Sequence, residues 1–376
     1  IMRLSFLIYS YFPYGGQQRD FFEIAKRCLD RGHEIDIYTL SWQGNIPERF
    51  NVKVVPIKAL TRIGRYKKYT SWVTNFLQGR EPSFVIGFNK MPGLDLYFAA
   101  DSCFLEKAYK QRAYYYRFTP RFNHFSNYEN EVFGDDQNTE IMVLTAQQKE
   151  GFKRYYPGCN SRLHDLPPGI SPDRRLESRR EIRRIEFRKR FRISESDLVL
   201  LQIGSGFKIK GVDRSLAAIA SLPSELKGRI KFILVGKDRP SNVLKIARRL
   251  GVSSLLTIVP GSNDIPSFLA GADLMIHPAY QESAGHVLLE STVSGLPVLT
   301  TYTCGYAYHI EKAESGLVCS EPFDQSELNQ KLSMMLKEIN SRAWSENGVV
   351  YGRENDLYSL HDRATDLIEK FAKTNL

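Results

Sequence analysis

The first part of the chain alternates apolar runs with amphipathic segments. Residues 3–9 are apolar, and residues 17–31 carry apolar side chains three and four positions apart, which is the spacing of one helix face. Gly32 follows where a helix-terminating glycine is expected. Strands separated by helices predict βαβ units and a parallel sheet. Further strands are predicted at 34–39, 52–57, 84–88 and 141–144.

A break in this pattern lies at residues 166–172, which read Leu-Pro-Pro-Gly-Ile-Ser-Pro. Such a segment continues neither a helix nor a central strand. The alternation then restarts, with strands predicted at 198–203, 231–235, 256–259, 274–277 and 297–300 and a helix from about Val212. We therefore predict an α/β fold of two Rossmann-like domains that face each other across a cleft, where open parallel sheets bind their ligands. The predicted domains are residues 1–168, joined by a C-terminal helix at about 353–376, and residues 169–352.

Composition restricts the class of protein. With 376 residues, 42% hydrophobic and 25% charged, the chain has the composition of a globular protein. It contains no apolar run long enough to span a membrane, and the apolar start ends at Pro13 without a cleavage site, so we expect no signal peptide. The five cysteines include no CxxC pair, which argues against a disulfide framework or a zinc site.

Charge and aromatic residues gather in two segments. The net charge is +10, and residues 174–192 hold ten Lys or Arg against three Glu. An excess of this kind predicts a polyanionic partner. Residues 103–133 hold ten Phe or Tyr interleaved with Lys and Arg. This pattern fits the interface of an anionic bilayer, a surface that stacks nucleic-acid bases, or a helical excursion with a buried core.

The main chemical signal lies at residues 282–290, which read Glu-Ser-Ala-Gly-His-Val-Leu-Leu-Glu. Glu282 precedes a predicted helix and Glu290 lies within it. The start of that helix carries partial positive charge and free amides, which bind phosphate. Two glutamates at this spacing also occur on solvated helix faces, so the spacing alone leaves both interpretations open. The backbone contacts to a ligand are expected from Ala284, Gly285, His286 and Val287.

This block, placed between the strand ending at His277 and the one after Gly295, resembles the E-x7-E motif of the retaining glycosyltransferases of family 4. Those enzymes have the GT-B fold of two Rossmann-like domains. Further segments are similar to the members that glucosylate the inner core of lipopolysaccharide, and together they cover nearly the whole chain: 11–20, 87–95, 167–170, 210–215 and 277–282. The resemblance implies that glucose passes from UDP-glucose to a heptose with retention. It does not decide between glucose and another hexose as the transferred sugar, nor which hydroxyl of the acceptor reacts.

The resemblance also assigns roles to residues. Glu282 meets the sugar, Glu290 meets the ribose, and Lys210 pairs with the diphosphate. The family's second basic residue is replaced here by Ser205 or Ile209, and Lys208 is a nearby substitute. The remaining candidates are the donor-phosphate and acceptor loop Gly15-Gly16, the acids Asp20 and Asp101, and a second cation, Arg174. From the residues alone, other interpretations fit equally well. Gly15-Gly16 is also an ordinary βα turn, and Asp20 is also an acid at the start of a helix. Asp101 is also a helix N-cap, and Arg174 is also the first member of the basic run.

The implied acceptor is a lipid-anchored glycan. We therefore expect a peripheral protein on the cytoplasmic face of the inner membrane, with residues 103–133 on an anionic surface and no nucleic-acid partner. No Asp-x-Asp pair follows a strand and no His and carboxylate cluster has metal-ligand spacing, so we expect no metal, with Lys210 and the helix start in its place. His277, at the end of a strand, is interpreted as structural. Three alternatives stay open: a nucleotide-sugar epimerase, a dehydrogenase that uses Gly204-Ser205-Gly206 without a third glycine, and a basic binding protein without catalytic activity.

Overall fold

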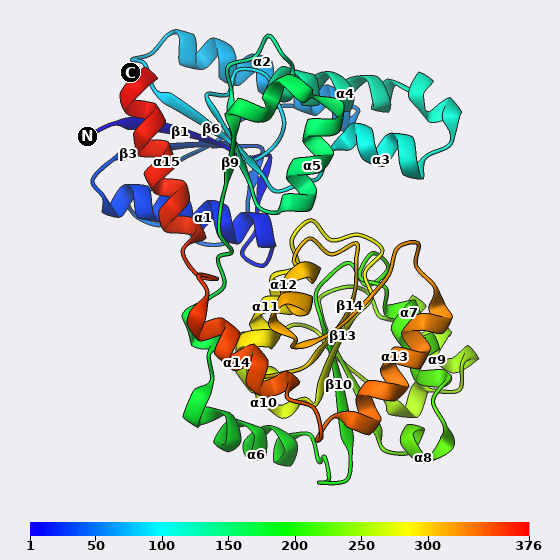
Figure 1. Cartoon of the computed structure of the whole chain (residues 1–376). Helices are drawn as coiled ribbons and strands as arrows, with labels where there is room; N and C mark the ends of the chain where they lie inside the picture. Colours follow the sequence, from blue (N-terminus) through cyan, green and yellow to red (C-terminus); the bar gives the residue numbers. More distant parts are fainter. Residues whose placement is uncertain (376) are drawn as a thin grey trace. The chain divides into compact units, whose positions relative to one another are not determined.

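The computed structural model describes residues 1–375, and the chain forms two compact units (Figure 1). Unit 1 comprises Ile1–Gly169 and Ser359–Leu376, of which residue 376 lies outside the described part, and unit 2 comprises Ile170–Tyr358. Both units are built on parallel sheets with helices between the strands, so the predicted class of two Rossmann-like α/β domains is confirmed. The C-terminal segment enters unit 1 at Ser359 rather than at about 353, because residues 344–354 form a helix of unit 2.

Unit 1 contains, within the described residues, a seven-stranded sheet in the order β5-β3-β1-β6-β7-β8-β9. All of its strand pairs are parallel. The chain order reverses on either side of β1, which creates a switch point where loops from neighbouring strands diverge. The strands are β1 (Arg3–Leu7), β3 (Glu34–Thr39), β5 (Asn51–Val54), β6 (Phe84–Gly87), β7 (Leu96–Ala99), β8 (Glu140–Val143) and β9 (Leu163–Asp165), and β2 (Ser10–Tyr11) pairs separately with β4 (Ser41–Trp42).

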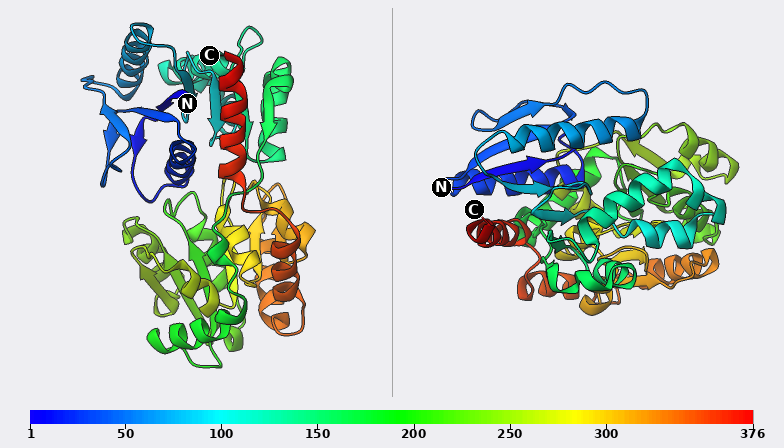
Figure 2. Two further views of the ribbon diagram at one scale, coloured as in Figure 1. Left: turned by 90° about the vertical axis from the view of Figure 1, so that its left-hand side faces the viewer. Right: turned by 90° about the horizontal axis from the view of Figure 1, so that it is seen from above.

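The helices of unit 1 connect the strands of this sheet or follow the last of them. They are α1 (Gly16–Asp30), α2 (Arg62–Gln78), α3 (Phe104–Gln111), α4 (Pro120–Phe133), α5 (Ala146–Tyr155) and α15 (Leu360–Asn375), with 3-10 turns η1 (Tyr114–Phe118) and η2 (Pro157–Arg162). Helix α1 buries Phe21, Ile24 and Cys28 on one face, as the sequence spacing predicts. Helix α15 packs across α1, and ion pairs such as Arg27–Asp362 at 2.9 Å join the two helices (Figure 2).

Unit 2 contains a six-stranded parallel sheet in the order β12-β11-β10-β13-β14-β15. Its strands are β10 (Leu198–Ile203), β11 (Ile230–Val235), β12 (Leu256–Val259), β13 (Leu274–His277), β14 (Val298–Thr301) and β15 (Gly316–Cys319). Its helices are α6 (Arg180–Arg190), α7 (Val212–Ala220), α8 (Ser224–Lys227), α9 (Ser241–Arg249), α10 (Ile265–Gly271), α11 (His286–Val293), α12 (Ala307–Ala313), α13 (Gln325–Glu338) and α14 (Trp344–Glu354), with 3-10 turns η3 (Pro172–Arg174), η4 (Glu177–Arg179) and η5 (Ser253–Leu255).

The basic run at residues 174–192 is only partly a charged surface. Arg184 and Arg188 lie on α6 and both contact the carboxylate of Asp273, at 2.6 and 3.3 Å. Each guanidinium also donates to backbone carbonyl groups of unit 2, among them those of Ala272 and Asp197. A planar guanidinium with several donors is suited to such multiple contacts. These two cations therefore fasten α6 to the sheet instead of presenting their charge to a partner.

Candidate functional site

Three side chains, two of them predicted site residues, meet at the carboxyl ends of two neighbouring strands of unit 2. Strands β10 and β13 pair in parallel, so the loops that follow them lie at the same edge of the sheet. Lys210, in the loop between β10 and α7, donates from Nζ to Oε2 of Glu282, which follows β13. His277, the last residue of β13, places Nε2 3.2 Å from the same oxygen. The structure thus brings Glu282 and Lys210 together and adds His277, which the sequence pattern led us to interpret as structural.

The environment of Glu282 keeps its carboxylate ionised. Burial by itself disfavours the charged form, since only 17% of the side chain is exposed. The hydrogen bond from His277 and the charge of Lys210 outweigh that effect, and they lower the pKa of Glu282 to about 2. Oε1 receives no hydrogen bond from the residues that the structure describes, because both donors use Oε2. A negatively charged oxygen is therefore available to bind hydroxyl groups of a ligand.

Helix α11 supplies an anion-binding end beside this carboxylate. Gly285 caps the helix with φ +94° and ψ 54°, a left-handed conformation that glycine adopts without strain. Ala284 is buried, and its carbonyl oxygen accepts from the amide of Tyr306 at 2.7 Å. His286 and Val287 begin the helix, where amides lack an acceptor within the helix and carry partial positive charge. These are the amides that the sequence predicts for a diphosphate.

The Gly285→Ala variant tests this cap. A Cβ atom there would lie 3.2 Å from Cγ of Glu282 and 3.3 Å from Cδ1 of Leu288, on a backbone that disfavours alanine. We expect the free energy of unfolding to fall by about 1–2 kcal/mol in urea denaturation. The Gly228→Ala variant is the control, because Gly228 has φ −62° and its added Cβ comes only within 3.4 Å of Ser224. Equal stability of both variants would contradict the strained cap.

Glu290 and Arg174, both predicted to bind the donor, also lie together in unit 2. Glu290 is on α11 and is 7% exposed. Nε of Arg174 lies 3.4 Å from its Oε1, and Nη1 of Arg174 also contacts Asp173 at 2.8 Å. The carboxylate is therefore partly neutralised and held at one edge of α11. The structure places the two ends of the E-x7-E block, Glu282 and Glu290, with a separate cation beside each.

The glycine-rich loop after β10 has a partner that the sequence pattern does not identify. The carboxylate of Asp238 accepts from the amides of Gly206 at 2.9 Å and Phe207 at 2.7 Å. This contact fixes the loop that leads to Lys210. Of the two lysines in this loop, Lys210 is half-buried and contacts Glu282, whereas Lys208 is exposed. The signal for this contact in the sequence is the presence of an acid, Asp238, three residues after β11.

The candidates of unit 1 have different environments. Gly15 caps α1, and Gly16 opens the helix with no atom within 4 Å of an added Cβ. Asp20 is 2% exposed, and Oδ1 lies 2.9 Å from Nε2 of His361 on α15. Asp101 is exposed and follows β7 by two residues. Within unit 1, the structure thus joins Asp20 to the C-terminal helix, a contact absent from the sequence prediction.

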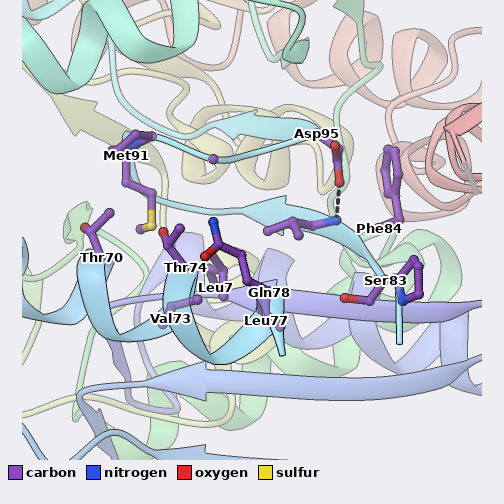
Figure 3. Close-up of a pocket in the computed structure, with 14 residues that line it drawn as sticks. Leu7, Thr70, Val73, Thr74, Leu77, Gln78, Ser83, Phe84, Met91 and Asp95 are labelled. Atoms are coloured by element: carbon purple, nitrogen blue, oxygen red, sulfur yellow. Dashed lines mark hydrogen bonds between the residues drawn. The ribbon is translucent and has the colours of Figure 1, made fainter. Parts of the chain in front are cut away.

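A separate pocket of about 330 Å³ lies in unit 1 between α2, strand β6 and the loop of residues 91–95 (Figure 3). Thr74 and Leu77 line it from α2, Met91 lines it from a loop, and Asp95 points toward the backbone of β6. The carboxylate of Asp95 accepts from the amide of Val85 at 2.7 Å. None of the predicted site residues lines this pocket.

Residues 1–375 contain neither a metal-binding cluster nor a membrane-spanning helix. No group of three or more His, Cys, Asp or Glu is placed to hold a metal ion within that range. Over the same residues, no helix combines the length and the apolar character needed to cross a bilayer.

Comparison with known proteins gives consistent matches. Residues 183–349 match the family described as glycosyl transferases group 1. The chain is 44% identical over 368 residues to the lipopolysaccharide glucosyltransferase WaaG of Escherichia coli K12, and the match covers 98% of each sequence. A crystal structure of WaaG superposes with a TM-score of 0.92 and 44% identity, covering 97% of this chain and 99% of that one. A structure of Anabaena HepE with UDP and glucose, 16% identical with a TM-score of 0.74 over 98% of this chain and 100% of that one, shares the fold.

Proposed function

The chain belongs to the group 1 glycosyl transferases, and we propose that it transfers glucose from UDP-glucose to a heptose of the lipopolysaccharide inner core with retention of configuration. The name of the full-length relative, a lipopolysaccharide glucosyltransferase, supports the sugar and the acceptor class. The observation that carries the proposal is the meeting of Lys210, Glu282 and the start of α11 at one edge of the unit 2 sheet. A cation, a carboxylate and helix amides are the groups that an activated sugar with a diphosphate requires.

The residues of unit 2 then have distinct roles. Glu290 binds the ribose, and Glu282 binds hydroxyl groups of the glucose through Oε1. Lys210 and the amides at the start of α11 bind the diphosphate. As the bond from C1 of glucose to the diphosphate oxygen breaks, its electron pair stays on that oxygen, and the fixed positive charge stabilises it. Because Lys210 and α11 supply this charge, the proposal includes no metal.

The acceptor completes the exchange. Its hydroxyl oxygen bonds to C1 on the face that the diphosphate leaves, and its proton passes to a phosphate oxygen of the leaving group. Gly15, Gly16, Asp20 and Asp101 of unit 1 belong to the acceptor side in this proposal. Asp20 acts there as an acid whose orientation His361 fixes, since the two side chains are 2.9 Å apart and both are buried.

Release of UDP tests the function. The purified chain is mixed with UDP-glucose, UDP-galactose or UDP-N-acetylglucosamine, with and without lipopolysaccharide truncated to its heptose region. We expect UDP release that is fastest with UDP-glucose and that depends on the acceptor. An epimerase would instead convert the sugar without releasing UDP. Lack of UDP release with every donor in the presence of acceptor would overturn the proposal.

We also propose that the protein works on the cytoplasmic face of the inner membrane, with residues 103–133 of unit 1 on the lipid surface. Glu129 on α4 anchors this segment: it is fully buried and accepts from Nζ of Lys90 and from the amides of Phe104 and Leu105, which begin α3. Figure 1 shows α3 and α4 extending from the sheet of unit 1, with η1 between them. The most exposed aromatic side chains of the segment are on η1: Tyr114 at 68%, Tyr115 at 75% and Phe118 at 76% exposure. Arg112 and Arg121 flank them and are also exposed.

Sedimentation with vesicles tests the lipid surface. We expect binding to vesicles of phosphatidylglycerol and phosphatidylcholine at low salt, and release at high salt, because anionic lipid attracts the flanking arginines. Replacing Tyr114, Tyr115 and Phe118 together by serine should lower the bound fraction relative to free protein by at least about tenfold, since three large apolar side chains no longer enter the interface. Leu60→Ser is the control, because Leu60 is fully exposed elsewhere in unit 1. Unchanged binding of the triple variant would assign the contact to another surface.

A further inference from the structure

His277 is a buried histidine in direct contact with the central carboxylate of the site. It ends β13, five residues before Glu282, and its side chain is 0% exposed. Nε2 lies 3.2 Å from Oε2 of Glu282. Nδ1 is buried and has no hydrogen-bond partner among the described residues. A histidine that only filled space in the core would gain nothing from a nitrogen directed at a carboxylate.

These contacts define which nitrogen carries the proton. With the proton on Nε2, the ring donates to Glu282 and leaves Nδ1 as an acceptor without a partner. With the proton on Nδ1, the ring would place a lone pair against the carboxylate and bury a donor without a partner, which is the more costly arrangement. The geometry therefore corresponds to an Nε2–H group that donates to Oε2.

Under the proposed function, Lys210 pairs with two different anions. In the structure its ammonium group is paired with Oε2 of Glu282. When a nucleotide sugar binds, the diphosphate carries more negative charge than one carboxylate and attracts the same ammonium group. The side chain of Lys210 is 20% exposed, and a lysine has a flexible stem that can turn between the two anions. Glu282 then loses its nearest positive charge at the moment when its carboxylate must bind the sugar.

We propose that His277 is a positioning residue that keeps Glu282 ionised and directs its Oε1 toward the sugar when Lys210 turns to the diphosphate. The inference rests on the proposed function, because it needs a diphosphate that competes for Lys210. His277 is suited to this role because its ring is enclosed at the end of a core strand and is unable to follow the ligand. By holding Oε2, it leaves Oε1 as the oxygen that faces the glucose hydroxyls.

No other described side chain can take over this role. The titratable groups that face Glu282 are Lys210 from the loop before α7, His277 from β13 and Cys304 from the loop after β14. Burial, followed by the nearby charge of Glu282, raises the pKa of the Cys304 thiol to about 11, so the thiol stays neutral. Its sulfur accepts from Oγ1 of Thr300 at 3.3 Å and makes no hydrogen bond to Glu282 in the described residues.

Two variants separate positioning from packing. His277→Gln retains an amide nitrogen that can replace Nε2, whereas His277→Leu fills the same region without a donor. We expect kcat for UDP release to fall by about tenfold to a hundredfold in His277→Leu, the loss typical of a hydrogen bond to a charged group, with KM for UDP-glucose changed by less than about threefold. His277→Gln should recover kcat to within about threefold of wild type.

The pH profile gives a readout that a packing role would not change. Without the donor, burial of Glu282 is less well opposed, so its pKa rises and the acid limb of kcat moves to higher pH in His277→Leu. In His277→Gln the acid limb should stay near its wild-type position. Equal loss of kcat in both variants, or wild-type kcat in both, would overturn the proposal, as would an acid limb in His277→Leu that does not move.

A measurement without turnover separates this inference from the proposed function. Urea unfolding is measured for wild type, His277→Leu, Glu282→Gln and the double variant. If His277 and Glu282 interact as proposed, the effects of the two changes on the unfolding equilibrium constant differ from additivity by about tenfold. Additive effects would overturn the inference. If the two changes are non-additive but the wild-type chain releases no UDP, the contact between His277 and Glu282 stands and the proposed glycosyl transfer is wrong.

Discussion

The Glu282→Gln variant is expected to lose turnover by about 10²–10³-fold in the UDP-release assay while it keeps its fold. Glutamine has nearly the shape of glutamate but no negative charge. Oε1 of Glu282 is then replaced by a group that binds the glucose hydroxyls more weakly as positive charge develops at C1. The carboxylate is largely buried beside a cation, so its removal also removes its own desolvation cost. The lost contacts with Lys210 and His277 outweigh this gain, because they lower the pKa of Glu282 to about 2 and so stabilise the fold. We therefore expect a lower urea midpoint in a protein that is still folded without urea.

A matched control makes this result specific. Glu186 lies on α6 of the same unit and is exposed, so Glu186→Gln makes the same chemical change away from the site. It should retain wild-type kcat and KM. Wild-type turnover of Glu282→Gln would remove Glu282 from the reaction, and an unfolded Glu282→Gln protein would assign the residue a structural role.

The Lys210→Met variant is expected to lose turnover by about 10³-fold or more, because the leaving diphosphate loses its main side-chain cation. Methionine keeps most of the apolar stem, so packing near Gly204 changes little. Affinity for UDP should also fall by at least about tenfold in calorimetry, since a charge-assisted contact is lost. Lys208→Met, which removes an exposed lysine two positions earlier, should lower kcat by less than about fivefold.

Loss of Lys210 should also change how stability depends on pH. In the wild type, Glu282 has a pKa of about 2, below its ordinary value of 4.5. Its ionised form therefore contributes stability above pH 4.5, and this contribution disappears as the pH falls toward 2. In Lys210→Met that pKa rises, so the variant should lose less stability than wild type between pH 5 and pH 3. Parallel urea curves of the two proteins over this range would contradict the ion pair.

Four predicted strands, at 34–39, 198–203, 256–259 and 274–277, have the bounds found in the structure. For β10 and β13 the reason is that a largely apolar run marks a strand buried on both faces, whereas β12 contains no buried residue. Strands β9 and β15, three and four residues long, are not among the predicted strands. Strand β9 has one apolar residue in three and therefore shows no period. The C-terminal helix begins at Leu360 instead of at about 353. Helix α14 ends at Glu354, and residues 355–359 form an irregular connection between the two helices.

The site shows a similar division. The motif around Glu282 and the lysine after the glycine-rich loop are visible in the sequence because each is a local pattern. The contacts that tune them are not local. His361 meets Asp20 across 341 positions, and Arg184 and Arg188 are taken by Asp273 rather than by a partner. His277 is only five positions from Glu282, but its contact depends on how the loop after β13 turns back toward the strand end.

The linkage formed on the acceptor shows both whether glucose is transferred and whether its configuration is retained. UDP-glucose labelled with ¹³C in the glucose is incubated with the chain and heptose-terminated lipopolysaccharide, and the anomeric signal of the product is recorded by NMR. We expect labelled α-glucose attached to heptose, absent with Glu282→Gln and with Lys210→Met. Labelled β-glucose on the acceptor would contradict retention, and an acceptor without label while the donor is consumed would contradict glycosyl transfer itself.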